Sequence, residues 1–431
     1  MRSFYGSKKM ATDVDVQYFS HLNGLTLGNN WGDLIRLLDK ALVTGIDFTQ
    51  ITAASIDAQG DVYITLYAAH NAMLFQVVEL TGFTPVSLNQ KYRIKGVPNT
   101  NELILKPHTA IAETAISTVG AGKLTSLGYE IIFRDTNDVK RVYRAKNPTA
   151  QHPFIRVDET ISDGVNSYGS AYAKYAMVGL LDNMTHIDDY ENPGVLQLPF
   201  NPSNLKQNWN IAGSGTTVVR GWSRWIWARS NNLYQNWSDV NGVTNGNRNF
   251  TLIGDADAFY LQMPVGTTAW NKRIYGAGLF DSTLKTSIVP NWFLMSRIST
   301  ANASVSYVST ETYGSPLVSS EVASRFLTPA FDELVPLKSH VAALPILPDY
   351  NSGFSDVYGG GNSAAMQIPF CDANKVLRGS LKHVYYNGKN FGSTDVSVPF
   401  LEESSMYVRD SAWVSGSNLV GTVTYYLGEL E

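Results

Sequence analysis

Cysteine is almost absent from this chain of 431 residues, since Cys371 is the only one. A single cysteine excludes an intrachain disulfide framework and offers no zinc-binding spacing, so we expect Cys371 to be a small buried hydrophobe. Charged residues are also scarce, at 16%, and the formal net charge is −4. A chain without a basic excess lacks the electrostatic footprint of a nucleic-acid-binding protein, so we expect no nucleic-acid partner.

Long apolar runs are missing as well. No stretch approaches the ~18 apolar residues that a membrane-spanning helix needs, so we expect no membrane insertion. The first residues, "MRSFYGSKKMATDVDVQYF", carry charge but lack the apolar centre of a signal peptide. The sequence therefore predicts a protein that is made in the cytoplasm and does not leave by that secretory route.

Motifs for catalysis, metals and cofactors are absent too. No histidine has a partner at metal-ligand spacing, and neither a G-x-S-x-G elbow nor a phosphate loop occurs. Two acidic turns offer weak alternatives: "THIDDYEN" (Asp188, Asp189) for a cation, and "GDADAF" (Asp255, Asp257) for part of a calcium loop. We interpret both as polar turns. The sequence predicts no enzyme, and no catalytic, metal or cofactor-binding residue.

What the chain does have is typical of β-proteins. Gly, Ser, Thr and Asn are plentiful and aromatics reach 12%, which suits short strands joined by polar turns. One helix is predicted in "NNWGDLIRLLDKALVTG", with Asn30 as its cap, Asp33 in its first turn and Gly45 as its stop. Its apolar stripe consists of Leu34, Leu37, Leu38, Ala41 and Leu42.

The strand pattern predicts a mainly β fold, with a β-sandwich-like core, one N-terminal helix and an inserted small β-barrel or sandwich module. Residues 1–45 form the arm and helix, and 46–122 form the inserted all-β domain. Residues 123–345 form the β-rich core, which 346–431 complete with a final strand in "TVTYYLGEL". The stretch "AYAKYAMVGLLDNM" is expected to be a short helix or an irregular excursion.

The most charged stretch is "KRVYRAKNPTAQHPFIRVDET", residues 140–160. It begins with the second strand of a predicted hairpin, whose turn lies at Asp135–Asp138, and it ends in a further strand. Strand periodicity places Arg141 and Tyr143 on one face and Lys140, Val142 and Arg144 on the other, while Arg156 and Asp158 share a face of the next strand. Mixed signs favour inter-strand or inter-subunit ion pairs over a phosphate-binding strip.

The residues assigned to these ion pairs are Arg141, Arg144, Arg156 and Asp158. Arg144 is expected to reach Asp158 or Glu159 across the strands. His152, in the loop before Pro153, has no evident partner that would make it a base.

Aromatic residues and arginines gather between residues 220 and 237. Such side chains form subunit contacts, and they also stack on sugars. The period of the strand puts Trp225 and Trp227 on one face, and one face of the strand is expected to be core. The candidates for an interface or a glycan contact are Arg220, Trp222, Trp225, Trp227, Tyr234 and Trp237.

Several segments of the chain carry distinctive patterns: "GDLIRLLDKALVTGIDF", "LGYEIIFRDTNDVKRVYRAKNPTAQHPFIRVDET", "FTLIGDADAFYLQM" with "IYGAGLFDS", and "VLRGSLKHVYY". Together they resemble a family of tailed-bacteriophage virion proteins. These matches follow one another in a consistent order over roughly residues 20–430. Two departures stand out: residues 46–122 come between the helix and the hairpin, and residues 165–250 match poorly.

The resemblance implies a structural component of the virion, from the tail, baseplate or neck, that acts by oligomeric assembly and docking. It implies other virion proteins as partners, a homo-oligomer such as a ring or trimer, and a location in the virion. It offers no catalytic residue. The alternatives are a fibre-type receptor-binding protein that contacts host-surface glycans through the aromatics at 220–237, and a polysaccharide depolymerase.

Overall fold

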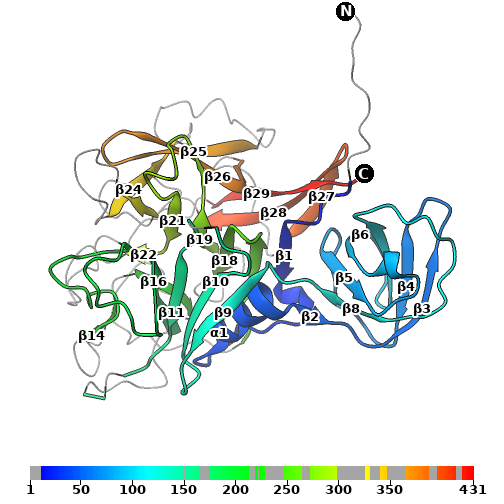
Figure 1. The fold of residues 1–431 in the computed structure, drawn as a ribbon, viewed down its shortest axis with the longest axis horizontal. Coiled ribbons are helices and arrows are strands. Elements are labelled where there is room, and N and C mark those ends of the chain that lie inside the picture. Colours follow the sequence, from blue (N-terminus) through cyan, green and yellow to red (C-terminus); the bar gives the residue numbers. More distant parts are fainter. Residues whose placement is uncertain are drawn as a thin grey trace, which may run out of the picture.

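The computed structural model describes residues 11–149, 151–162, 164–165, 174–212, 219–221, 223–228, 246–264, 272–298, 326–330, 340–346, 365–387, 396–413 and 420–431. These residues form antiparallel sheets and one short helical region near the N-terminus, so the predicted mainly β, sandwich-like fold class is confirmed (Figure 1). No helix of these ranges is long and apolar enough to cross a membrane.

The largest sheet has 13 strands, in the order β1-β17-β18-β19-β21-β23-β24-β25-β26-β29-β28-β27, with β20 beside β26. Its strands are β1 (Gln17–Ser20), β17 (Thr251–Gly254), β18 (Ala258–Pro264), β19 (Lys272–Leu279), β20 (Asp281–Ser282), β21 (Trp292–Met295), β23 (Phe326–Pro329), β24 (His340–Pro345), β25 (Met366–Asp372), β26 (Leu377–Tyr386), β27 (Val398–Glu402), β28 (Ser405–Trp413) and β29 (Val420–Glu429). The predicted C-terminal strand is confirmed as β29, which lies between β26 and β28. Cys371, on β25, is only partly buried, so its expected burial was wrong.

A second sheet has seven strands, in the order β22-β16-β12-β11-β10-β9, with β13 beside β12. Its strands are β9 (Tyr129–Arg134), β10 (Lys140–Ala145), β11 (Phe154–Asp158), β12 (Lys174–Leu181), β13 (Gln197–Leu198), β16 (Ser223–Ala228) and β22 (Arg297–Ile298); β14 (Ile211–Ala212) and β15 (Val219–Arg220) pair separately. The predicted hairpin is confirmed, because the Asp135 carboxylate accepts hydrogen bonds from the amides of Val139 and Lys140.

The expectation of a helix or irregular segment at "AYAKYAMVGLLDNM" was wrong. Residues Lys174–Leu181 are strand β12, which is buried along its whole length between β11 and β16. A central strand covered on both faces has a continuous apolar sequence without alternation, and periodicity alone cannot tell such a run from a helix.

A third sheet also has seven strands, and all of them come from one continuous part of the chain. Its order is β2-β8-β5-β6-β7-β4-β3, and it lies to one side of the other sheets (Figure 1). The strands are β2 (Ile46–Asp47), β3 (Ile51–Ile56), β4 (Val62–Leu66), β5 (Val77–Thr81), β6 (Lys91–Asn99), β7 (Glu102–Pro107) and β8 (Ala121–Leu124). The 3-10 turn η3 (Val86–Leu88) joins β5 to β6, and a further 3-10 turn, η1 (His21–Asn23), follows β1. That this sheet is an inserted domain stays a prediction.

The helical region begins as α1 (Asp33–Leu38) and continues as the π-helical turn η2 (Asp39–Thr44). Its predicted apolar stripe is buried in the main core. The helix ends at Gly45, whose φ of 73° and close approach to the Leu124 carbonyl leave no room for a Cβ. The predicted cap was wrong, because Gly32 occupies the N-cap position and the Asp33 carboxylate accepts a hydrogen bond from the Asn30 amide instead.

The main core lies between the 13-stranded sheet and the second sheet. Trp225 on β16 packs edge-to-face on Phe259 of β18, with ring centroids 5.9 Å apart, and Tyr129 of β9 contacts the same phenylalanine at 5.7 Å. The cluster continues through the stripe of α1 into the apolar face of the third sheet. Burial of this continuous apolar surface is the main force that holds the sheets together.

Candidate functional site

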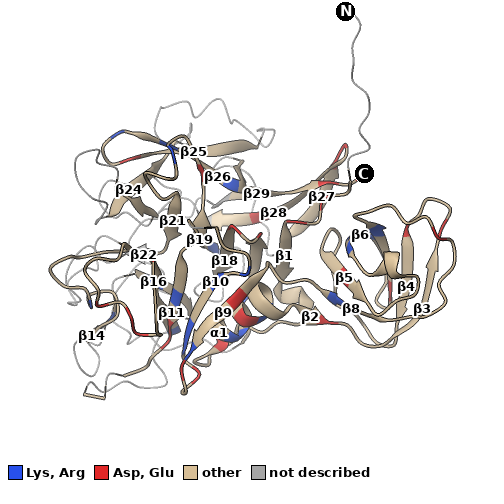
Figure 2. Cartoon of the chain, in the orientation of Figure 1, with Lys and Arg blue, Asp and Glu red and all other residues tan. Residues whose placement is uncertain are grey.

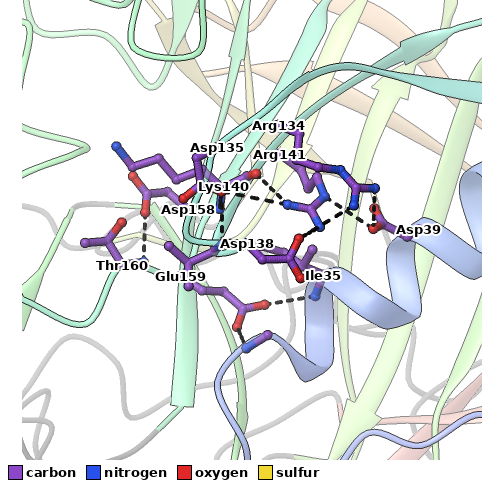
Figure 3. A network of polar contacts seen from close by, with 12 residues as sticks. Ile35, Asp39, Arg134, Asp135, Asp138, Lys140, Arg141, Asp158, Glu159 and Thr160 are labelled. Atoms are coloured by element: carbon purple, nitrogen blue, oxygen red, sulfur yellow. Dashed lines mark hydrogen bonds and ion pairs between the residues drawn. The ribbon is translucent and has the colours of Figure 1, made fainter.

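The charged stretch at residues 140–160 lies against the helical region, and Figure 3 shows its contacts. Arg141, of which only 1% is exposed, points toward the helix. Its Nε lies 3.2 Å from the Asp39 carboxylate, and its guanidinium also bonds Asp138 in the hairpin turn. The Tyr143 hydroxyl donates to the other Asp39 oxygen at 2.7 Å. This face of β10 therefore fastens the hairpin to the helix.

The opposite face of the same strands carries a second group of charges. Arg156 lies 3.0 Å from Asp158 and 2.6 Å from Asp188, and its guanidinium covers the Trp209 ring at 4.3 Å. The Lys140 ammonium lies 2.9 Å from Asp188. Burial opposes the charge of Asp188, but hydrogen bonds from Lys140 and Arg156 lower the pKa of its carboxyl. Asp188, interpreted from the sequence as part of a polar turn, thus forms ion pairs with both Lys140 and Arg156.

The expected pairing of Arg144 with Asp158 or Glu159 was wrong. The register places Lys140 opposite Asp158, so Arg144 lies four residues further along β10. Its Nε donates instead to the His152 carbonyl at 3.3 Å, and its guanidinium lies over the Phe154 ring at 4.5 Å. In the cartoon of Figure 2, stretches coloured for acidic residues and stretches coloured for basic residues both occur around α1, β9 and β10.

Glu159 has a role that the sequence did not reveal. Its fully buried carboxylate accepts hydrogen bonds from the amides of Gly32 and Ile35, the latter at 2.9 Å, and so caps the helix from a distant strand. These amides are among the donors that a helix start leaves unpaired. Burial raises the pKa of Glu159 to about 7, against the opposing effects of the two amides and of Arg220. The spacing of 127 residues gave no local signal for this contact.

We expect the replacement Glu159→Gln to change how stability depends on pH. A carboxyl whose folded-state pKa exceeds its usual value of 4.5 binds a proton on folding between these two values. Its contribution to the free energy of unfolding therefore falls as the pH rises from 4.5 to about 7, and is level above that. The glutamine variant should lose this dependence, and should also lose about 1–2 kcal/mol because an amide offers one oxygen where two were used.

Urea unfolding of both proteins across this pH range measures the effect. The exposed Glu113→Gln variant is the control, and it should keep the slope of the unmodified chain. An unchanged slope in Glu159→Gln would show that another group binds the proton.

A second polar cluster joins the turn before β18 to β26 and to the loop before β11. His152 Nε2 lies 2.9 Å from Asp257, and His383 Nε2 lies 2.7 Å from Asp255. The Lys382 ammonium also binds Asp257. The expectation that His152 lacks a partner was therefore wrong. Hydrogen bonding to His152 is the largest influence on Asp257, and with Lys382 it holds the pKa of that carboxyl well below its usual range.

Hydrogen bonds within this cluster limit the reactions that it could catalyse. The Thr149 hydroxyl lies 3.0 Å from His152 Nδ1, which gives a hydroxyl–imidazole–carboxylate order like that of a nucleophilic triad. The Thr149 amide, however, donates a hydrogen bond to the same Nδ1 at 2.9 Å. The imidazole therefore binds the backbone of its own loop and stabilises the turn there. Across the described ranges, no three His, Cys, Asp or Glu side chains are grouped to hold a metal ion.

The aromatic candidates that the structure describes are core residues. Trp225 and Trp227 are both 0% exposed; Trp225 donates to the Met295 carbonyl at 3.0 Å, and Trp227 packs on Trp31. Arg220, also 0% exposed, lies over the Tyr175 ring at 4.0 Å. A glycan cannot reach these three side chains, so that interpretation was wrong for them. Trp222, Tyr234 and Trp237 lie outside the described residues.

Comparison with known proteins gives no family. No family model matches the sequence, and no curated protein matches it. Among solved structures, the chain is similar to one titled "Phage phi92 endosialidase", with a TM-score of 0.14 and 9% identity over 90% of this chain and 51% of that one. The chain thus spans about half the length of that structure, and a TM-score so low carries no argument about fold or activity.

Proposed function

We propose that this chain is a structural component of a tailed-phage virion, in the tail, baseplate or neck, and that it acts by assembling with copies of itself and with other virion proteins. The ordered series of motifs over residues 20–430 supports this proposal. The observation that carries it is that charged side chains of one of these motifs, "LGYEIIFRDTNDVKRVYRAKNPTAQHPFIRVDET", point into the molecule. Arg141, Arg156 and Glu159 bind the helix and neighbouring loops, which is the work of a scaffold and not of a substrate site.

A scaffold of this kind functions through its surfaces. Obligate assemblies bury more than about 2,000 Å² per interface, and repetition of weak contacts in a symmetric array supplies the overall strength. Rigid sheets suit this task because little conformational freedom is lost when copies dock. That the chain is not an enzyme stays part of the proposal.

Sizing of the purified full chain, together with a glycan array and a reducing-sugar assay, tests the proposal. We expect defined oligomers, no glycan signal and no release of sugar from host polysaccharide. The alternative of a fibre-type receptor-binding protein predicts strong glycan signals; with Trp225 and Trp227 buried, these would have to come from other residues. Strong glycan binding, or release of reducing sugar, would contradict the structural role.

A further inference from the structure

The outer face of strands β27, β28 and β29 carries a row of aromatic rings. Phe400 pairs with Tyr407 across β27 and β28, with ring centroids 5.3 Å apart, and Tyr407 pairs with Tyr426 of β29 at 5.5 Å. All three rings are partly exposed. Neighbouring residues such as Val408 and Tyr425 point to the other face, which is buried in the core of the large sheet. We call Phe400, Tyr407, Tyr426, Val398 and Arg409 the aromatic strip.

The strip lies at an end of the large sheet. β27 is the last strand of the sheet order, and Figure 1 shows it near the C-terminus. Val398, on the same face as Phe400, is 44% exposed. Pro399 in the edge strand has no amide hydrogen to donate, which opposes the addition of another strand at this edge. The face, and not the edge, is therefore the surface suited to a partner.

Charges lie on both sides of the rings. Arg409 is opposite Val398, two residues from Phe400 along β27, and its guanidinium lies over the Phe400 ring at 4.7 Å. Glu402 and Ser405 lie two residues from the same ring in the other direction, and Ser405 is opposite Glu429. At about 3.4 Å per residue, the backbone positions of Arg409 and Ser405 are equally far from Tyr407 along β28, roughly 7 Å each.

The acidic end is built to remain charged. The Glu429 carboxylate accepts hydrogen bonds from the hydroxyls of Ser404, Ser405 and Tyr426, each at 2.6 Å. Although burial opposes its charge, these three bonds lower the pKa of the carboxyl. Glu402 and Glu403, both exposed, add negative charge beside it.

From this arrangement we propose that the aromatic strip binds the aromatic strip of a second copy of the chain. A two-fold axis that lies between the two faces and runs across the strands exchanges the two ends of the strip. Arg409 of each copy then meets the acidic end of the other, while the rings pack at the centre. Self-complementarity of this kind is what an isologous contact requires, and Tyr and Arg are enriched at the centres of such interfaces.

A glycan fits the strip less well than a second copy does. Sugars stack on exposed ring faces, whereas Tyr407 and Arg409 already occupy ring-face area of Phe400. The inference rests on the proposed assembly function and names a surface through which copies associate. An isologous contact closes at two copies, so a ring or trimer would need a further, different contact.

Sedimentation velocity of the full chain tests the contact with two charge variants, Arg409→Glu and Glu402→Arg. Each variant alone places like charges opposite one another, and we expect its dimer dissociation constant to rise about tenfold or more. An equimolar mixture of the two variants restores opposite charges at both ends, so the mixture should return to nearly the affinity of the unmodified chain. This rescue requires folded variants, which separates loss of contact from loss of fold.

Tyr407→Ser should weaken association by a similar factor. The control is Tyr67→Ser, at a tyrosine that is 77% exposed on the third sheet, and this variant should associate as before. The proposal is overturned if the unmodified chain stays monomeric, or if it associates equally well in every variant. In the second case the virion assignment would still stand, because it depends on the presence of the chain in particles and not on this surface.

Discussion

Replacement of Asp410 by alanine is expected to lower the free energy of unfolding by about 3–5 kcal/mol, because it leaves a buried ammonium without its counter-ion. Lys272 of β19 and Asp410 of β28 form an ion pair of 2.6 Å, and both side chains are 0% exposed. The carboxylate also accepts from the Thr251 hydroxyl at 2.6 Å and from the Ser411 amide at 2.7 Å. The pair joins strands that are far apart in the sheet order.

The matched controls are Lys272→Met and the double variant Lys272→Met, Asp410→Leu. Each single change leaves one charge without its partner in the interior. The double change replaces the pair by apolar groups of similar volume and should recover most of the lost stability. Chemical denaturation of these proteins, with Asp410→Leu added as the matching single variant, closes a double-mutant cycle and gives the coupling energy. Single variants that each cost less than about 1 kcal/mol would show that the pair is solvated and contributes little.

Arg93→Met is the second change with a large expected effect. It should lower the free energy of unfolding by about 4 kcal/mol. The Arg93 side chain is 0% exposed and makes five hydrogen bonds to the carbonyls of Asp13, Val16, Phe75 and Leu427. These acceptors belong to the N-terminal arm, the turn before β5 and β29, whereas Arg93 is on β6, so one guanidinium joins the third sheet to the arm and to the large sheet. Without it the four carbonyls lose a partner in a buried place, at about 1 kcal/mol each.

The measurement for Arg93→Met is urea unfolding combined with limited proteolysis. If the guanidinium holds the third sheet in place, cleavage within residues 46–124 should become faster than in the unmodified chain. Arg36→Met, at a side chain that is 55% exposed, is the control and should change stability by less than about 0.5 kcal/mol. Equal stability and equal proteolysis of Arg93→Met would contradict the joining role. Burial lowers the pKa of Arg93 to about 10, so the group is charged at neutral pH.

Features that depend on a few consecutive residues could be predicted from the sequence, whereas contacts between residues far apart in the sequence could not. Strand periodicity separates Arg141 from Lys140 and places Arg156 with Asp158, because alternation is a property of a few consecutive residues. The partners of the same residues lie far away: Asp39 is 102 residues from Arg141, and Asp257 is 105 residues from His152. No local pattern carries such pairings, which follow from how the sheets pack.

Burial of the aromatic candidates could not be predicted for a related reason. Trp225 and Trp227 lie on one face of their strand and have charged residues near them in the sequence. This pattern is typical of an exposed surface as well as of a core. In the structure β16 lies between β12 and β22 and is buried on both faces, so even its Arg224 is inside. Arg220, on the separate strand β15, is buried as well. The exposed aromatic strip on β27–β29 depends on which strands form the end of the sheet, and only the three-dimensional order shows that.

Quantitative mass spectrometry of purified particles, from the phage whose genome carries the gene, decides whether this chain is a structural part of the virion. If it is, its peptides should occur in the particles at a fixed ratio to the capsid protein and should remain after repeated purification. Recovery of the chain only from the soluble fraction of the lysate, with none in the particles, would contradict this role.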